Sequence, residues 1–233
     1  MKLGIMQPYF FPYIGYWQLM NAVDTYVIYD DVSFIKNGWI NRNRILINGE
    51  AKYFNLPTTG AGSFVQIKDV KLNPDPVLIG KLLKKLEVSY RKAPLYGEVM
   101  PLLERILTYE TLSMVNLLEF QLREIAAYLG ITTQLLISSR DVKKDNSLSG
   151  QDKVIDICRS LKATEYYNAI GGQELYDSEA FSRNGISLYF LKTSSIVYPQ
   201  YKNEFVCDLS IIDVMMFNPV EDIRKMLLAY RLL

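Results

Sequence analysis

Short apolar runs alternate with helical patterns at both ends of the chain. Apolar or aromatic residues dominate positions 3–6, 25–29, 134–137, 165–169 and 186–191, and each run stops at polar, proline or glycine residues, which predicts buried strands. Helical spacing covers residues 13–23, 113–129, 151–161, 209–217 and 220–230. Because a helix that joins two short apolar strands usually makes them parallel, we predict an α/β fold with a mostly parallel sheet.

The pattern changes in the middle of the chain. Residues 44–70 alternate between apolar and polar types, and Asn48-Gly49 indicates a β-hairpin turn between residues 45–47 and 53–56. Helical spacing returns over residues 74–90 and 95–109. We therefore expect a single domain over residues 1–233, in which a mixed β-hairpin and helical insertion around residues 40–110 interrupts the parallel sheet.

Polar or glycine-rich segments follow four of the predicted strands, at residues 7–16, 30–44, 138–150 and 168–176. The carboxyl ends of parallel strands meet at one edge of a sheet, and ligands of such sheets bind at that edge. The strand pattern therefore predicts that the four segments come together around a ligand site.

Composition narrows the function classes. The 233 residues include 26 Lys and Arg and 25 Asp and Glu, so the formal net charge is +1. This balance argues against a DNA-binding protein or a polybasic membrane binder, because both carry a large basic excess. The chain has no histidine, which excludes a Ser-His-Asp triad, a Cys-His pair and histidine-ligated zinc.

The cysteines and the hydropathy pattern indicate the cellular compartment of the protein. Cys158 and Cys207 lie far apart, among apolar residues and without metal-ligand spacing, so we expect two buried thiols and no metal site. No apolar stretch approaches the roughly 20 residues of a membrane-spanning helix, and the first apolar run is too short for a signal peptide. We therefore expect a cytoplasmic protein without a membrane span.

The first polar segment is an aromatic loop that leads from a strand into a helix. Two prolines stiffen it, and Gly15 lets the helix begin close to a ligand. A helix start after a strand attracts anions because its N–H groups are free. The alternative is a loop that only caps the core. The candidate substrate-binding residues here are Gln7, Tyr9, Tyr13, Gly15 and Tyr16.

This layout resembles the nucleotidylyltransferase class of α/β folds, in which a strand runs through a proline turn into a His-x-Gly-His motif at a helix start. Here the motif reads Tyr13-Ile14-Gly15-Tyr16, with tyrosines in place of both histidines. The resemblance covers the first strand, loop and helix. It implies a Rossmann-like sheet of the nucleotidylyltransferase or HUP type, and it leaves ATP with magnesium as the one candidate cofactor.

The second segment begins with paired carboxylates at a strand end. Asp30 and Asp31 could hold an amine or accept its proton, so they are the candidate catalytic groups together with the point charge of Lys36. The alternative is a solvated turn with surface ion pairs.

The rest of the second segment offers groups that bind ligands. Arg42 and Arg44 have forked donors for phosphate or carboxylate, and Trp39 has a stacking face. Charges of both signs beside an indole and amides suit a sugar phosphate or an amino sugar. The candidate substrate-binding residues here are Trp39, Asn41, Arg42 and Asn43.

The third and fourth segments contain hydroxyl groups and glycines. Residues 138–153 form a loop and helix start that could cradle an anion, although the P-loop spacing is absent; the alternative, a helix cap at Ser149, can coexist with a cradle. The pair Gly171-Gly172 permits close backbone approach and is equally typical of a tight turn. The candidate substrate-binding residues are Ser138, Ser139, Ser149, Gly150, Lys153, Asn168, Gly171 and Gly172.

Taken in order, these segments resemble the WbqC-like family of bacterial proteins. The matching stretches are residues 6–15, 30–43, 150–158, 166, 171–172, 209–213 and 217–218, so the resemblance covers nearly the whole chain. Its most specific part is the block Asp-Asp-Val, Lys, then Trp-Ile-Asn-Arg-Asn. The resemblance implies a role in the biosynthesis of O-antigen and other surface polysaccharides, with transfer of glycine or a similar acyl group to an amino sugar.

Together the segments and the resemblance lead to a specific expectation. We expect an enzyme that transfers an aminoacyl or acyl group from an activated donor to the amine of a nucleotide-linked amino sugar. The alternatives are a non-catalytic nucleotide-sugar-binding subunit of a biosynthetic complex and an ATP-using, carboxylate-activating enzyme. A homodimer is left open, and the charge balance disfavours an RNA-binding role.

Overall fold

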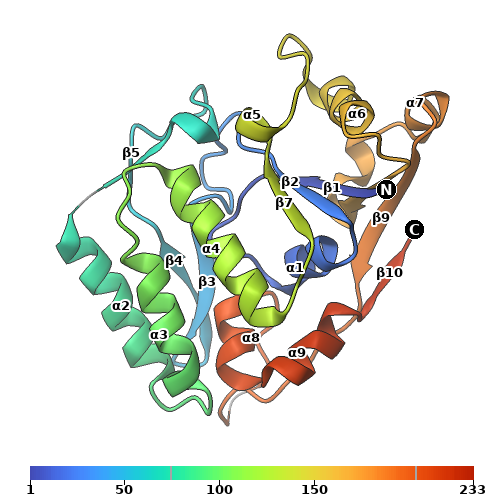
Figure 1. Cartoon of the computed structure of the whole chain (residues 1–233). Coiled ribbons are helices and arrows are strands. Elements are labelled where there is room, and N and C mark those ends of the chain that lie inside the picture. The colour runs from blue at the N-terminus through green and yellow to red at the C-terminus, as the bar shows by residue number, and fades with distance from the viewer. Residues whose placement is uncertain (74, 203) are drawn as a thin grey trace.

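Six strands form one sheet through the centre of the molecule, within residues 1–73, 75–202 and 204–233, which the computed structural model describes (Figure 1). Across the sheet they lie in the order β10 (Tyr230–Leu232), β9 (Ser187–Thr193), β8 (Glu165–Ala169), β1 (Lys2–Met6), β2 (Thr25–Ile28) and β7 (Gln134–Ile137). The strands from β9 to β7 are parallel, and β10 is antiparallel to β9. The mostly parallel sheet that the sequence predicts is therefore confirmed.

The last strand was not expected. The sequence predicted one helix over residues 220–230, but α9 (Val220–Leu227) ends earlier and the chain continues as β10. Tyr230 pairs with Thr193 and Leu232 pairs with Leu191 at the free edge of β9. This pairing is a tertiary contact, which helical spacing within the sequence does not reveal.

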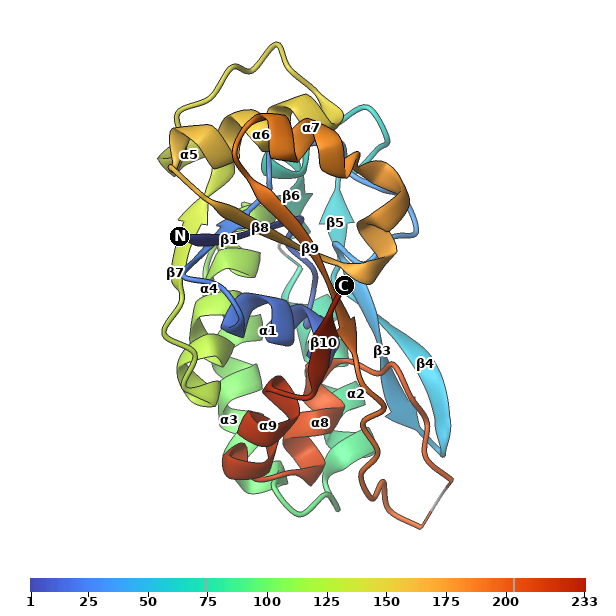
Figure 2. The same cartoon turned by 90° about the vertical axis from the view of Figure 1, so that its right-hand side faces the viewer.

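Helices cover both faces of the sheet (Figure 2). On one face lie α1 (Ile14–Asn21), α4 (Met114–Leu129), α8 (Ile211–Phe217) and α9, and on the other lie α6 (Gly150–Ser160) and α7 (Ser178–Arg183). Successive strand residues face opposite ways, so Tyr26 and Ile28 of β2 belong to the core with α1 and α4, and Val27 belongs to the core with α6. No helix in the described part of the chain is long and apolar enough to cross a membrane.

Between β2 and α4 the chain forms two short pairs of strands and two helices. β3 (Arg42–Ile47) and β4 (Glu50–Asn55) pair as a hairpin, and Asn48 and Gly49 have the positive φ values, 52° and 80°, that such a turn requires. A second short pair, β5 (Thr58–Thr59) and β6 (Lys71–Leu72), precedes α2 (Pro76–Tyr90) and α3 (Tyr96–Leu107). Residue 74, where the first of these helices was predicted to begin, lies outside the described residues.

The two cysteines differ in environment. Cys158 lies in α6 and is buried in the core, as expected. Cys207 is exposed, so the expectation of a second buried thiol is wrong. Cys207 precedes Leu209 and α8. The apolar residues that follow it in the sequence are buried in the core, but the side chain of Cys207 is not.

A buried carboxylate joins the hairpin to α8 and thereby positions β3. Asp213 is fully buried and accepts three hydrogen bonds, from the hydroxyls of Tyr90 at 2.9 Å and Tyr198 at 2.8 Å and from the amide of Gln200 at 2.6 Å. Burial raises the pKa of Asp213, and these donors offset part of the rise. The hydroxyl of Tyr90 also accepts the N–H of Leu46 at 3.0 Å, so the cluster holds β3 in place.

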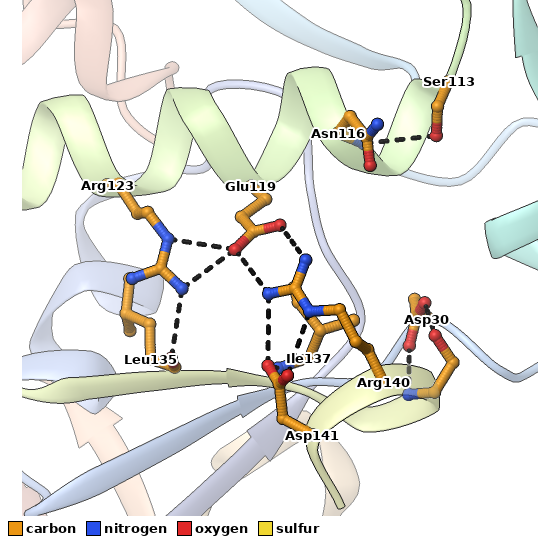
Figure 3. A network of polar contacts seen from close by, with 10 residues as sticks. Asp30, Ser113, Asn116, Glu119, Arg123, Leu135, Ile137, Arg140 and Asp141 are labelled. Atoms are coloured by element: carbon orange, nitrogen blue, oxygen red, sulfur yellow. Dashed lines mark hydrogen bonds and ion pairs between the residues drawn. The ribbon is translucent and has the colours of Figure 1, made fainter.

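Glu119 connects α4 to the edge of the sheet (Figure 3). It accepts hydrogen bonds from Arg123 on the same helix at 2.9 Å and from Arg140 on α5 (Ser138–Asp141) at 3.0 Å. Arg123 also donates to the carbonyl oxygen of Leu135 in β7 at 3.1 Å. Burial raises the pKa of Glu119, but the two guanidinium groups outweigh burial and hold the pKa below its usual value.

We expect Glu119→Gln to lower the free energy of unfolding by about 1 kcal/mol at neutral pH, because it removes the charge from these hydrogen bonds. Since the folded pKa is lowered, the stabilisation is present above the unfolded value of about 4.3 and is lost as the pH falls through the folded pKa. Urea unfolding of both proteins at about pH 7 and about pH 3 measures the difference.

The exposed pair Glu179 and Arg183 provides the control, because Glu179→Gln removes an ion pair of the same spacing that is open to solvent. This variant should change stability little at either pH. A Glu119→Gln effect that is as large in acid as at neutral pH would contradict the charge-based explanation.

Candidate functional site

A cavity of about 680 Å³ opens at the carboxyl ends of β1 and β8. Residues 5–7 at the end of β1 and 168–172 at the end of β8 line it, together with residues from the segment 32–44. At β1 the strand order reverses, because the chain runs from β1 to β2 and β7 on one side and then to β8 and β9 on the other. Ligands of open parallel sheets bind at such a point. We call this space the aromatic cavity.

Three of the four segments expected at this edge line the aromatic cavity. Its lining includes five tyrosines and one tryptophan, which offer π faces and hydroxyl groups to a ligand. The candidate residues that line it are Gln7, Tyr9, Tyr13, Tyr16, Trp39, Asn43, Asn168, Gly171 and Gly172. The candidate set omitted the lining residues Tyr29, Arg44, Tyr176 and Asp208.

The aromatic loop of residues 7–13 is held in a strained backbone conformation. Phe11 has a φ of 42°, in the left-handed region that bulky residues rarely adopt. Its N–H donates to Gln121 Oε1 at 2.9 Å, and its carbonyl oxygen accepts from Asn43 Nδ2 at 2.9 Å and Ser210 Oγ at 2.7 Å. Gln121 Nε2 also donates to the carbonyl oxygen of Tyr9 at 3.0 Å. Buried side chains from α4, β3 and the start of α8 therefore fix the loop.

Asn43 lines the aromatic cavity, but its amide supports the aromatic loop. Its Nδ2 donates to the carbonyl oxygens of both Phe10 and Phe11, at 3.1 Å and 2.9 Å. Its Oδ1 accepts the N–H of Arg44 at 2.8 Å. The polar atoms predicted to contact substrate thus hold the wall of the cavity in place.

We expect Gln121→Leu to lower the free energy of unfolding by about 3 kcal/mol, because it leaves the buried N–H of Phe11 and the carbonyl of Tyr9 without this partner. Urea unfolding measures the loss. Asn116→Ala, an exposed position on the same helix, is the control and should change stability by less than about 0.5 kcal/mol. If the two variants are equally stable, these hydrogen bonds do not secure the loop.

Tyr13 lies against the first turn of α1. A Cβ on Gly15 would be 2.3 Å from Tyr13 Oη and 2.6 Å from Thr193 Oγ1, so only glycine leaves room for both side chains. The sequence suggested that Gly15 gives a ligand access to this helix start. In the structure Gly15 is buried, and the space beside this helix start is occupied by Tyr13, whose ring lines the aromatic cavity.

Arg44 and Asp208 carry the charges among the described residues of the aromatic cavity. Arg44 Nη2 donates to the carbonyl oxygen of Asp208 at 3.0 Å, and the guanidinium lies 5.6 Å from the centroid of the Trp39 ring. Arg44 Nε is buried and has no hydrogen-bond partner among the described residues. A buried N–H without an acceptor is costly, and an anionic ligand is the acceptor that a guanidinium binds most strongly.

The two predicted catalytic carboxylates are buried at the end of β2 and do not line the aromatic cavity. Asp30 accepts the N–H of Ser139 at 2.9 Å and its hydroxyl at 2.5 Å. Burial raises the pKa of Asp30, and these bonds lower it only in part. Asp31 forms ion pairs with Lys144 at 3.1 Å and Lys153 at 3.0 Å. Both carboxylates therefore tie β2 to the third segment.

The third segment lies next to the aromatic cavity without lining it. Ser138 is buried at the start of α5, and Ser149 and Gly150 begin α6, where Ser149 makes no side-chain capping bond. Lys153 donates to the carbonyl oxygen of Asp31 and lies 5.4 Å from the ring centroid of Tyr29. Tyr29 lines the aromatic cavity, whereas Lys153 contacts the Tyr29 ring without lining that cavity.

Lys36, Asn41 and Arg42 line a second cavity of about 220 Å³, which we call the basic cavity. It lies beside the hairpin β3–β4 and β5, and its other lining residues are Phe34, Asn37, Asn55, Thr58 and Ala61. The segment 30–44 is thus divided between two cavities, with Trp39 and Arg44 at the first and Lys36 and Arg42 at the second.

These features define an α/β protein whose open sheet carries a cavity where the strand order reverses. The chain belongs to the WbqC-like protein family, which it matches over residues 7–225. One relative is the uncharacterized protein Rv1507c of Mycobacterium tuberculosis, which is 28% identical over 219 residues and aligned over 93% of each chain. No solved structure matches the chain. The family resemblance noted in the sequence is therefore confirmed.

Proposed function

We propose that this WbqC-like protein binds a nucleotide-linked amino sugar in the aromatic cavity and transfers an acyl or aminoacyl group, such as glycine, to the sugar amine. The role would lie in the biosynthesis of O-antigen or another surface polysaccharide. The observation that carries the proposal is the position and lining of the cavity: it lies where the strand order of the sheet reverses, and its aromatic wall includes Arg44, whose Nε–H has no hydrogen-bond partner among the described residues.

The chemistry of a nucleotide-linked sugar fits this lining. A base and a sugar ring can stack on tyrosine and tryptophan faces, and the amides of Gln7 and Asn168 can bond to sugar hydroxyls. The diphosphate would bind the guanidinium of Arg44, whose Nε–H donates to no acceptor among the described residues. Numbered along the chain, the parallel strands have the order 3-2-1-4-5, which is the order of Rossmann-like nucleotide-binding sheets.

Acyl transfer to an amine needs little acid–base machinery when the donor is already activated. The amine nitrogen attacks the carbonyl carbon, the leaving group departs with the bonding electrons, and the amine proton passes to a base. Among the described lining residues, Asp208 supplies the carboxylate for that last step. The rest of the acceleration would come from holding donor and amine together.

We expect Arg44→Gln to weaken the binding of a UDP-linked or dTDP-linked amino sugar by about 10-fold or more, because it removes a charged hydrogen-bond donor to phosphate. Isothermal titration calorimetry at physiological salt measures the dissociation constant. Arg42→Gln is the control. Arg42 lies two residues before Arg44 on the same strand, and its guanidinium donates hydrogen bonds to Gly38 and Asn37 instead.

No binding of any nucleotide-linked sugar would overturn the proposal. Equal weakening by the two variants would also contradict it, because the aromatic cavity would then have no special part in binding.

A second candidate, a non-catalytic nucleotide-sugar-binding subunit, is favoured by the burial of Asp30 and Asp31 away from the aromatic cavity. Incubation of the sugar with glycyl-tRNA or a glycyl thioester separates the two. N-acylated product supports the enzyme, whereas tight sugar binding without product from either donor supports the subunit.

A further inference from the structure

A short segment of the chain separates the basic cavity from the aromatic cavity. Residues 36–42 contribute Trp39 to the aromatic cavity, and they contribute Lys36 and Arg42 to the basic cavity. Arg42 also begins β3 and is paired with Asn55 at the end of β4, so the hairpin supports the basic cavity. One segment therefore carries lining residues of two separate spaces.

The charges in the basic cavity are of one sign. Lys36 and Arg42 line it, and no carboxylate does so among the described residues. Lys36 is exposed, and its ammonium group makes no hydrogen bond or ion pair with the described part of the chain. Two cations that line one cavity without a counter-charge repel each other, and an anion between them would relieve that repulsion.

Arg42 is preorganised to receive an anion. Its Nε donates to the carbonyl oxygen of Gly38 at 3.1 Å, its Nη2 donates to that of Asn37, and its guanidinium lies 4.3 Å from the ring centroid of Tyr53. The side chain is thus held by neutral acceptors and an aromatic face, which leave its charge uncompensated. A fixed guanidinium loses little conformational entropy when a ligand binds.

Amide and hydroxyl groups complete the lining of the basic cavity, and its volume limits the size of the ligand. Asn37, Asn41 and Asn55 offer both donors and acceptors beside the two cations, and Thr58 adds a hydroxyl. The volume of about 220 Å³ is below the roughly 300 Å³ at which pockets hold a whole drug-sized molecule. The space suits one anionic group with hydroxyl or amide neighbours rather than a complete nucleotide sugar.

We propose that the basic cavity is a second ligand site that binds the phosphate group of a small molecule, separately from the ligand of the aromatic cavity. One part of the proposal rests on the proposed function: the phosphate would then belong to the acyl donor, and the two substrates would flank residues 36–42. The binding of phosphate itself does not depend on that role.

The test is calorimetric titration of the full chain with inorganic pyrophosphate at physiological salt, which screens long-range attraction between exposed charges. We expect Lys36→Gln to weaken binding by about 10-fold, because it removes one of two cations at the site. Lys36 is exposed and makes no hydrogen bond or ion pair with the described residues, so this variant should fold normally. Lys92→Gln, another exposed lysine outside both cavities, should bind as the unmodified protein does.

Arg44→Gln distinguishes this proposal from the proposed function. Unchanged pyrophosphate affinity in Arg44→Gln, with loss in Lys36→Gln, supports a separate phosphate site even if no nucleotide sugar binds. Loss in Arg44→Gln without loss in Lys36→Gln would assign the phosphate to the aromatic cavity and overturn the proposal. Equal affinities of Lys36→Gln and Lys92→Gln, or no binding at all, would overturn it as well.

Discussion

The backbone of the aromatic loop at Phe11 is the constraint on which the site depends. A left-handed phenylalanine costs about 1–3 kcal/mol, and it persists because Gln121, Asn43 and Ser210 bond to its N–H and carbonyl from three different elements. These bonds connect α4, the inserted hairpin and the start of α8 to one loop. The tyrosines of that loop are thereby presented to the aromatic cavity, and the insertion is joined to the parallel sheet.

The charged groups divide into those that stabilise the fold and those that remain available to ligands. Asp30, Asp31 and Asp213 are buried and bonded to neighbouring elements. Arg44 and Lys36 retain donors that no described residue accepts. We therefore propose that the cavities mainly bind and position anionic ligands, with Asp208 as the carboxylate among their described lining residues. This arrangement suits a reaction whose donor arrives already activated.

The sequence predicted the fold better than the site. Strand positions, the hairpin at Asn48-Gly49 and the common edge of the segments follow from local patterns, which periodicity and turn chemistry reveal. Two features of the candidate site depend on tertiary contacts, which sequence patterns do not reveal. Arg42 and Arg44 are two residues apart on one strand, so alternation could not tell which reaches the aromatic cavity. Asp30 and Asp31 look catalytic at a strand end, and only the packing of α5 and α6 shows that they are buried.

A crystal structure of the protein with a UDP-linked amino sugar tests the central claim most directly. We expect the ligand between the ends of β1 and β8, with its base or sugar against the tyrosines and a phosphate oxygen within hydrogen-bond distance of the Arg44 guanidinium. A ligand bound elsewhere on the surface, or an aromatic cavity that stays empty at saturating ligand, would contradict the assignment of this cavity as the nucleotide-sugar site.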